Sequence, residues 1–134
     1  MQATVERHRS PASFGKSRRL LTAAQYSRVF DGADAKASHR TVLLLAKLND
    51  QPGHRLGLVI AKKNVRLAVQ RNRIKRIARE VFRQLPEQKR GLDVIVLARR
   101  GIDQLDNTEL AVILREQWSR LERFAAKPDA NRDS

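Results

Sequence analysis

Apolar residues recur along the chain in two rhythms, one typical of strands and one typical of helices. Residues 41–48 and 55–61 are apolar and partly β-branched, and residues 49–53 between them are of types that favour a turn. This pattern predicts a β-hairpin. Residues 92–98 are apolar enough to predict a third strand that is buried on both faces. A short additional strand before His39 is only weakly indicated.

A first helix is predicted from its capping residues. Thr22 and Gln25 have the spacing of a capping box, so the helix is expected to begin near Ala23. Gly32 is expected to end it.

Two further helices are predicted from apolar residues that recur every three or four positions. The first lies between the second and third strands and is expected to stop at Pro86. Its buried stripe is predicted to contain Val69, Ile74, Ile77, Ala78, Val81, Phe82 and Leu85. The second follows residues 106–108. One face of it is predicted to contain Leu110, Ile113, Leu114, Gln117, Trp118, Leu121 and Phe124.

The net charge indicates the kind of partner. The chain has 28 Lys and Arg residues against 14 Asp and Glu residues, and the resulting charge of +14 favours a polyanion. Membranes are also anionic, but the longest apolar runs have strand length, well below the ~20 residues that a membrane-spanning helix needs. The chain has no cysteine, which excludes disulfides and thiolate metal sites and is compatible with a reducing compartment. We therefore expect one cytoplasmic domain without a membrane segment.

Positive charge is concentrated between Lys62 and Arg83, where nine basic residues accompany a single acid, Glu80. The apolar stripe occupies one side of this helix, so the polar residues lie on the other side at spacings of three and four. They are Arg71, Asn72, Lys75, Arg76, Arg79 and Arg83. Like charges at this spacing repel one another, and the guanidinium fork suits phosphate. The pattern indicates a phosphate-bearing partner rather than a merely solvated helix face.

The same segment is similar to a known family. The matching motifs are Ala61-Lys62-Lys63-Asn64, Ala68-Val69, Arg71-Asn72-Arg73-Ile74-Lys75-Arg76 and Arg79-Glu80. The similarity extends back to Arg19-Leu20, Tyr26 and Val29-Phe30, and forward to residues 93–98. In these motifs the chain resembles bacterial ribonuclease P protein subunits. The resemblance implies a single ribonuclease P protein domain over residues 1–134, folded over about 14–124, with polar tails at 1–13 and 125–134.

The resemblance also implies a fold. It is an α/β, or α+β, sandwich in which a four-stranded sheet packs against helices. A left-handed βαβ crossover is expected to carry the Arg-Asn-Arg helix. About 98% of crossover connections between parallel strands are right-handed, so general topology rules alone would have favoured the opposite hand.

The activity that the resemblance implies is that of an accessory subunit. A ribonuclease P protein binds the catalytic RNA and the 5′ leader of precursor tRNA, and it assists the endonucleolytic removal of that leader. The RNA performs the hydrolysis, and the holoenzyme requires Mg²⁺. We therefore expect no catalytic side chain, no bound cofactor, no metal site and no obligate protein partner in this chain. A structural ribosomal-type RNA-binding protein is the alternative, because it would share the size and charge.

RNA-binding roles fall, by the same resemblance, on the basic helix and on the loop before it. The residues are Lys62, Lys63, Asn64, Arg71, Asn72, Arg73, Lys75, Arg76 and Arg79. The position of Arg73 leaves a second interpretation open. It is nearly in line with Ile77, so its stem could cover the edge of the core while its head reaches outward.

Aromatic residues are expected to bind the leader. Tyr26 and Phe30 lie one helical turn apart, and the resemblance places them in a cleft for the single-stranded leader, with Phe14 as an additional contact. The alternative is that both aromatics of the helix simply pack on the sheet. Residues 43–45 are all leucine where many family members have another aromatic residue, which reduces the expected stacking (Leu43, Leu44 and Leu45).

The other polar clusters are expected to be structural. Asp103, Asp106 and Glu109 could suggest a metal site, but capping and the helix dipole favour carboxylates at a helix start. The histidines have no partnered nucleophile and no metal-ligand spacing. We expect ordinary surface roles for His8, His39 and His54. An independent nuclease would need such groups, and a DNA-binding helix of the helix-turn-helix type would need a preceding turn-linked helix.

Overall fold

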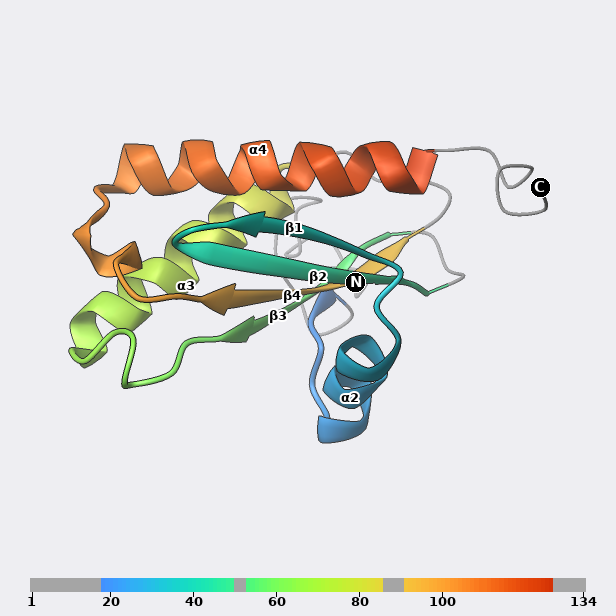
Figure 1. Ribbon diagram of the computed structural model, residues 1–134, viewed down its shortest axis with the longest axis horizontal. Helices are drawn as coiled ribbons and strands as arrows, with labels where there is room; N and C mark the ends of the chain where they lie inside the picture. Colours follow the sequence, from blue (N-terminus) through green and yellow to red (C-terminus); the bar gives the residue numbers. More distant parts are fainter. Residues whose placement is uncertain (1–17, 50–52, 86–90, 127–134) are drawn as a thin grey trace, which may run out of the picture.

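The computed structural model describes residues 18–49, 53–85 and 91–126, and these ranges form one sheet with helices on both of its faces (Figure 1). Three helices and four strands make up most of it, and a short 3-10 helix, η2, precedes the last helix. In chain order the elements are α2 (Ala23–Gly32), β1 (Ala35–His39), β2 (Val42–Leu48), β3 (Arg55–Val59), α3 (Ala68–Arg83), β4 (Leu92–Ala98), η2 (Ile102–Gln104) and α4 (Asn107–Ala126).

The sheet has the order β1-β2-β4-β3, which confirms four strands but corrects their expected pairing. The hairpin predicted between residues 41–48 and 55–61 is wrong, because β4 lies between β2 and β3. β4 is the strand that is buried on both faces, and the centre of a sheet is where such a strand is covered on both sides. The hairpin that does form joins β1 to β2, so the weakly indicated strand before His39 exists.

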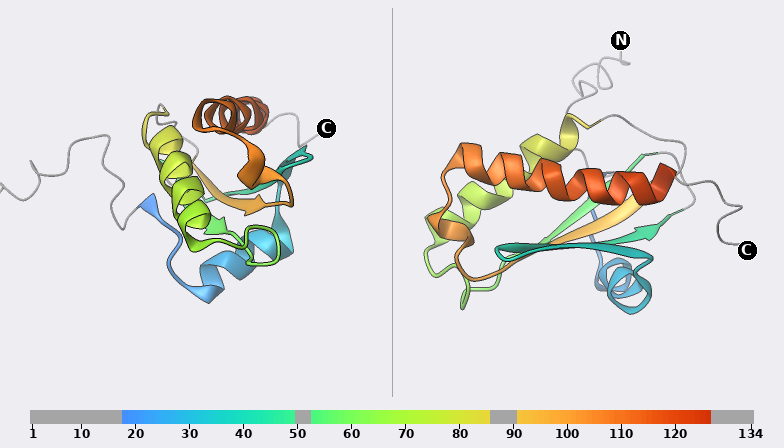
Figure 2. Two further views of the ribbon diagram at one scale, coloured as in Figure 1. Left: turned by 90° about the vertical axis from the view of Figure 1, so that its left-hand side faces the viewer. Right: turned by 45° about the horizontal axis from the view of Figure 1, so that its top comes forward.

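The connection from β3 through α3 to β4 has the unusual hand that the resemblance implied. β3 and β4 are parallel neighbours, and in Figure 1 both run to the left with β4 above β3. The helix α3 that joins them lies behind the sheet in that view, and it lies at the left when the molecule is turned (Figure 2). This arrangement is a left-handed crossover, against the general rule.

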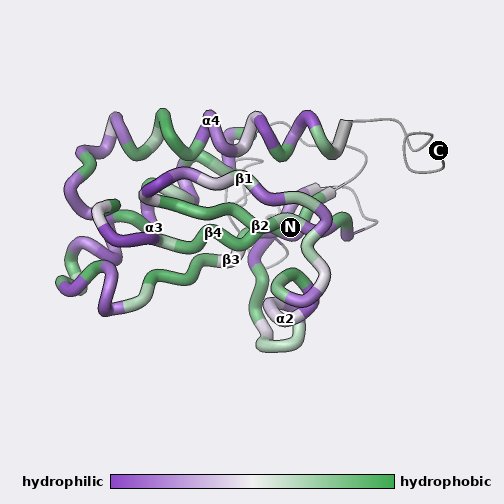
Figure 3. The backbone as a smooth tube through the Cα atoms, in the orientation of Figure 1, coloured by the Kyte–Doolittle hydropathy of each residue, from purple (hydrophilic) through white to green (hydrophobic). Residues whose placement is uncertain are grey.

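The two faces of the sheet are covered differently. α3 and α4 pack on one face and α2 on the other (Figure 2). Alternate residues of β4 point to opposite faces, so Val94 and Val96 join the larger core with Trp118, while Ile95 packs with Leu20 and Val29 under α2. Figure 3 shows mostly hydrophobic colour along β2 and β4, the two central strands, and alternating hydrophobic and hydrophilic colour along α4.

The predicted helices are largely confirmed. The capping box of α2 is present, since the Thr22 hydroxyl accepts from the Gln25 N–H and the Gln25 side chain accepts from the Thr22 N–H. Of the predicted stripe of α3, Ile77 and Leu85 are half-buried and four residues are fully buried, namely Ile74, Ala78, Val81 and Phe82. Val69 is 70% exposed, so its predicted burial is wrong. Leu67 just before it is exposed too, which shows that the first turn of α3 does not reach the core.

The start of α4 has a capping arrangement of its own. The Glu109 N–H donates to Asp106 Oδ1 at 2.8 Å, and the Glu109 carboxylate accepts from the Asp106 N–H at 2.9 Å. This reciprocal pair confirms the capping role that was predicted for Asp106 and Glu109. Over the described ranges, no group of three or more His, Cys, Asp and Glu side chains could hold a metal ion, and no helix is both long and apolar enough to cross a membrane.

One histidine is part of the interior, contrary to expectation. His54 is only 4% exposed, because its Nδ1 accepts from the Leu92 N–H at 3.0 Å and its ring meets the Trp118 ring edge-on at 4.6 Å. Burial, with a smaller contribution from the positive charge of Arg18, lowers the pKa of His54 to about 4. The prediction of a surface role for His54 is therefore wrong. His39 is half-buried beside Thr41, and His8 lies outside the described residues.

An ion pair between a half-buried arginine and a buried carboxylate fixes β3 beside β4. Arg55 donates from Nε to Asp93 Oδ1 at 2.8 Å and from Nη2 to Asp93 Oδ2 at 2.7 Å. The same carboxylate accepts from Asn49 Nδ2 at 2.9 Å, so the segment after β2 is tied to the pair. Hydrogen bonding to Asp93 raises the pKa of Arg55 above its usual value. A bidentate pair with a third donor is the arrangement that a buried carboxylate needs.

Candidate nucleic-acid interface

The outer side of α3 forms the wall of a groove of about 480 Å³, which we call the cationic groove. Ile74, Ala78 and Val81 are buried on the other side of the helix, and this turns the polar residues outward. The groove is lined by Arg19, Asn72, Lys75, Arg76, Arg79, Glu80 and Arg83. Four of the predicted RNA-binding residues are therefore brought together, namely Asn72, Lys75, Arg76 and Arg79.

Two cations of the groove were missing from the predicted set. Arg19 comes from the segment before α2, which pairs with the edge of β3 through a bond from the Leu20 N–H to the Leu56 carbonyl at 3.0 Å. No local pattern signals a pairing between segments so far apart. Arg83 continues the outward row of α3, so its spacing could have revealed it. It bonds Glu80, the only acid in the lining, at 2.7 Å.

A smaller cavity of about 130 Å³, here called the Tyr26 cavity, adjoins the cationic groove. Three basic residues, Arg19, Lys75 and Arg79, line both of them. The remaining lining of the cavity is Leu20, Tyr26, Leu56 and Leu58. The surface next to α2 is therefore continuous with the cations of α3.

Tyr26 packs closely on the sheet. Its hydroxyl accepts from the Leu58 N–H at 3.3 Å. The ring lies on Gly57, where an added Cβ would be 2.8 Å from two ring carbons. The packing role that was the alternative for this residue is thus present. Phe30, one turn further along α2, is 45% exposed and offers the more accessible aromatic surface.

The leucines that replace an expected aromatic residue differ in their surroundings. Leu44 is fully buried in the larger core, and Leu45 packs under α2. Leu43 is half-buried on the same strand. None of them supplies a ring for stacking. Phe14, the third predicted leader contact, lies outside the described residues.

The loop before α3 holds other predicted cations away from the groove lining. Lys62 and Lys63 are exposed, and Asn64 donates from Nδ2 to the Ala98 carbonyl at 3.0 Å, which ties this loop to the end of β4. Arg71 turns back to the loop, where Nη1 donates to the carbonyls of residues 65 and 66 at 2.9 Å. Arg71 and Asn64 thus have structural bonds that their predicted role did not anticipate.

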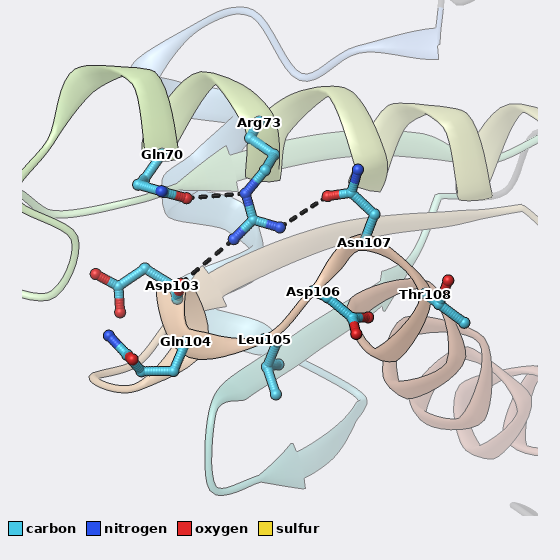
Figure 4. Close-up of a pocket in the computed structure, with 8 residues that line it drawn as sticks. All are labelled: Gln70, Arg73, Asp103, Gln104, Leu105, Asp106, Asn107 and Thr108. Carbon is cyan, nitrogen blue, oxygen red and sulfur yellow. Dashed lines mark hydrogen bonds between the residues drawn. The ribbon is translucent and has the colours of Figure 1, made fainter.

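Arg73 also points away from the cationic groove. Its guanidinium lies in a separate surface pocket between α3, η2 and the start of α4 (Figure 4). It donates to Gln70 and to Asn107. Arg73 is thus, like Asn64 and Arg71, a predicted RNA-binding residue that bonds within the protein.

Comparison with known proteins identifies the family. A family model described as ribonuclease P matches residues 14–122. The chain belongs to the ribonuclease P protein family. It is 50% identical over 117 residues to the ribonuclease P protein component of Stutzerimonas stutzeri, covering 87% of this chain and 89% of that one. It is 47% identical over 121 residues to the component of Pseudomonas aeruginosa, covering 90% of each chain.

Solved structures of ribonuclease P proteins have the same fold. The protein of Staphylococcus aureus gives a TM-score of 0.70 at 24% identity, covering 79% of this chain and 96% of that one. The Thermotoga maritima protein, solved with 1-(4-fluorophenyl)-2-thiourea, gives a TM-score of 0.64 at 24% identity, covering 73% and 94%. The α+β sandwich implied by the resemblance is therefore confirmed.

Family membership confirms the main functional interpretation. The chain is a ribonuclease P protein component involved in tRNA processing, and the ribosomal alternative is not favoured. The designation as a component of ribonuclease P also implies a partnership with the ribonuclease P RNA.

Proposed function

We propose that the chain binds the 5′ leader of precursor tRNA and the catalytic RNA on the continuous surface formed by the cationic groove and the α2 side of the sheet. The observation that carries this proposal is the sharing of Arg19, Lys75 and Arg79 between the groove and the Tyr26 cavity. Basic side chains and Tyr26 of α2 thus line one continuous surface. That combination is suited to single-stranded RNA, which offers both phosphates and unpaired base faces.

Each part of this surface has a distinct physical contribution. An exposed ring such as that of Phe30 can stack on a base of any sequence, at about 1 to 3 kcal/mol per base. The arginines of the groove can bind phosphate with two parallel hydrogen bonds. Stacking is tolerant of base identity and phosphate contacts carry no sequence information, so the surface suits leaders of differing sequence.

Hydrolysis of the phosphodiester bond is assigned to the RNA with bound Mg²⁺. Four of the described acids already have partners within the protein: Asp106 and Glu109 cap α4, Asp93 binds Arg55, and Glu80 binds Arg83. The contribution of the chain is then to bind the leader and to lower the electrostatic repulsion between two polyanions. The proposed place of action is the cytoplasm, where bacterial transcripts are made.

The proposal is tested by cleavage of a precursor tRNA at low Mg²⁺ in three reactions, with the purified protein alone, with a bacterial ribonuclease P RNA alone, and with both. We expect efficient cleavage only from the mixture. A protein that adds nothing to the RNA would restore the ribosomal-type alternative. Cleavage by the protein alone would show that catalysis does not belong to the RNA.

A further inference from the structure

Arg73 makes three hydrogen bonds, one within its own helix and one to each of two other elements (Figure 4). Nε donates to Gln70 Oε1 within α3 at 2.8 Å, and Nη1 donates to Asn107 Oδ1, on the first residue of α4, at 2.8 Å. Nη2 donates to the backbone carbonyl of Asp103 in η2 at a longer 3.4 Å. The rigid guanidinium fork therefore has a separate acceptor on each of its nitrogens.

The neighbours of Arg73 on α3 point in other directions. Asn72 and Arg76 line the cationic groove, whereas Arg73 lies in a different pocket. An α-helix turns by about 100° per residue, so any rotation of α3 would move all of these side chains together. A bond that fixes Arg73 against α4 consequently also fixes the direction in which Asn72 and Arg76 face.

We infer that Arg73 is a positioning residue, which sets the orientation of α3 by joining it to the start of α4 and does not itself contact RNA phosphate. This inference rests on the proposed function, because the row that it orients is the proposed RNA-binding row. Lysine could keep the charge of Arg73 but could not reproduce three donors in a planar fork. The charge and the geometry of the residue can therefore be tested separately.

The experiment measures the affinity of the full chain for ribonuclease P RNA from Pseudomonas aeruginosa over a range of salt concentrations. Each direct phosphate contact contributes about 0.7 to 0.9 to the slope of log affinity against log salt. Arg76→Ala, in the groove, should flatten the slope by that amount. Arg73→Ala should lower the affinity on the order of 3- to 10-fold while the slope stays at the wild-type value.

Two further variants separate positioning from contact. Arg73→Lys should fail to restore affinity, although it keeps the charge. Asn107→Ala changes no charge and removes only the acceptor for Arg73, and it should reproduce the loss seen with Arg73→Ala. Combining the two substitutions should add little further loss. Arg115→Ala is the matched control, because it removes an exposed arginine that is not among the residues lining the groove.

The possible results distinguish this inference from the proposed function. A flatter slope for Arg73→Ala, recovery in Arg73→Lys, or wild-type affinity in Asn107→Ala would each overturn the positioning role while the groove stays intact as a binding surface. A wild-type slope near zero would instead refute the proposed function itself. If Arg73→Ala does not fold in a thermal unfolding assay, Arg73→Lys and Asn107→Ala decide the question.

Discussion

Replacing Gly57 by alanine should disturb α2 through a single contact. The added Cβ would lie 2.8 Å from Tyr26 Cε2 and Cζ and 2.9 Å from its hydroxyl oxygen, whereas carbon atoms in contact prefer about 3.5 to 4.0 Å. The ring must therefore move by several tenths of an ångström or more. Its hydrogen bond to the Leu58 N–H, already 3.3 Å long, would then be lost.

The cost follows from these two effects. Overpacking costs about 1 to 3 kcal/mol, and the Leu58 N–H loses a bond that is worth about 1 kcal/mol. We expect Gly57→Ala to lower the free energy of unfolding by about 2 to 3 kcal/mol. Without the tyrosine ring the clash disappears, and alanine is better than glycine within a strand by about 0.5 to 1 kcal/mol. In a Tyr26→Ala background, the same substitution should thus be neutral or stabilising.

Urea unfolding, followed by the fluorescence of the single tryptophan, Trp118, measures all four proteins of this double-mutant cycle. Gly32→Ala is the control, because its Cβ would meet only the flexible end of Lys47, at 3.2 Å. Effects of Gly57→Ala and Tyr26→Ala that add within about 0.5 kcal/mol would refute the contact as the cause.

Three other outcomes are expected. Phe30→Ala should weaken the binding of leader-bearing precursor tRNA by about 1 to 3 kcal/mol and leave the binding of mature tRNA nearly unchanged. Leu21→Ala, at another exposed apolar residue of the same region, is the control, and equal losses for both RNAs would refute the stacking role. Asp93→Ala should lower the free energy of unfolding by about 2 kcal/mol, since the partly exposed Arg55 guanidinium loses two charged hydrogen bonds. Glu80→Ala, in an exposed pair, should cost less than about 1 kcal/mol, and similar losses for the two variants would contradict this difference. Because the pKa of His54 is lowered in the folded protein, the unfolded chain takes up the proton first as the pH falls. The contribution of neutral His54 to the free energy of unfolding should therefore be complete above pH 6.5 and decrease toward pH 4, by at most about 3 kcal/mol. Urea titrations at pH 7 and pH 4 measure this, and a His54→Gln variant with the same pH dependence would assign the effect to another group.

Local signals predicted the elements but not their neighbours in the sheet. The capping box of α2 and the double burial of β4 depend on adjacent residues, so the sequence contains enough information to predict both. The turn residues at 49–53 show only that the chain reverses direction. They do not show which strand pairs with β2. In the structure β4 lies between β2 and β3, and its pairing depends on the whole core.

The same distinction applies to the candidate interface. The periodicity of α3 predicts which side faces solvent, and the cationic groove lies on that side. It does not predict what each long side chain bonds to. Arg71 and Arg73 both turn to acceptors within the protein, and Arg19 enters the groove because a distant segment pairs with β3. His54 was misjudged for a similar reason, since its partners, Leu92 and Trp118, are far away in the sequence.

The different surroundings of the cations limit how many phosphates the groove can neutralise. Five basic side chains and one carboxylate line it, giving a net charge of +4. At about 0.7 per phosphate for single strands, four contacts correspond to a salt slope of about −2.8. A leader-binding slope steeper than about −4 would require cations beyond the groove, and Lys62 and Lys63, which are exposed in the loop before α3, are candidates. In that case a Lys62→Ala/Lys63→Ala variant should bring the slope back toward the groove value, because the two contacts that it removes would be the additional ones.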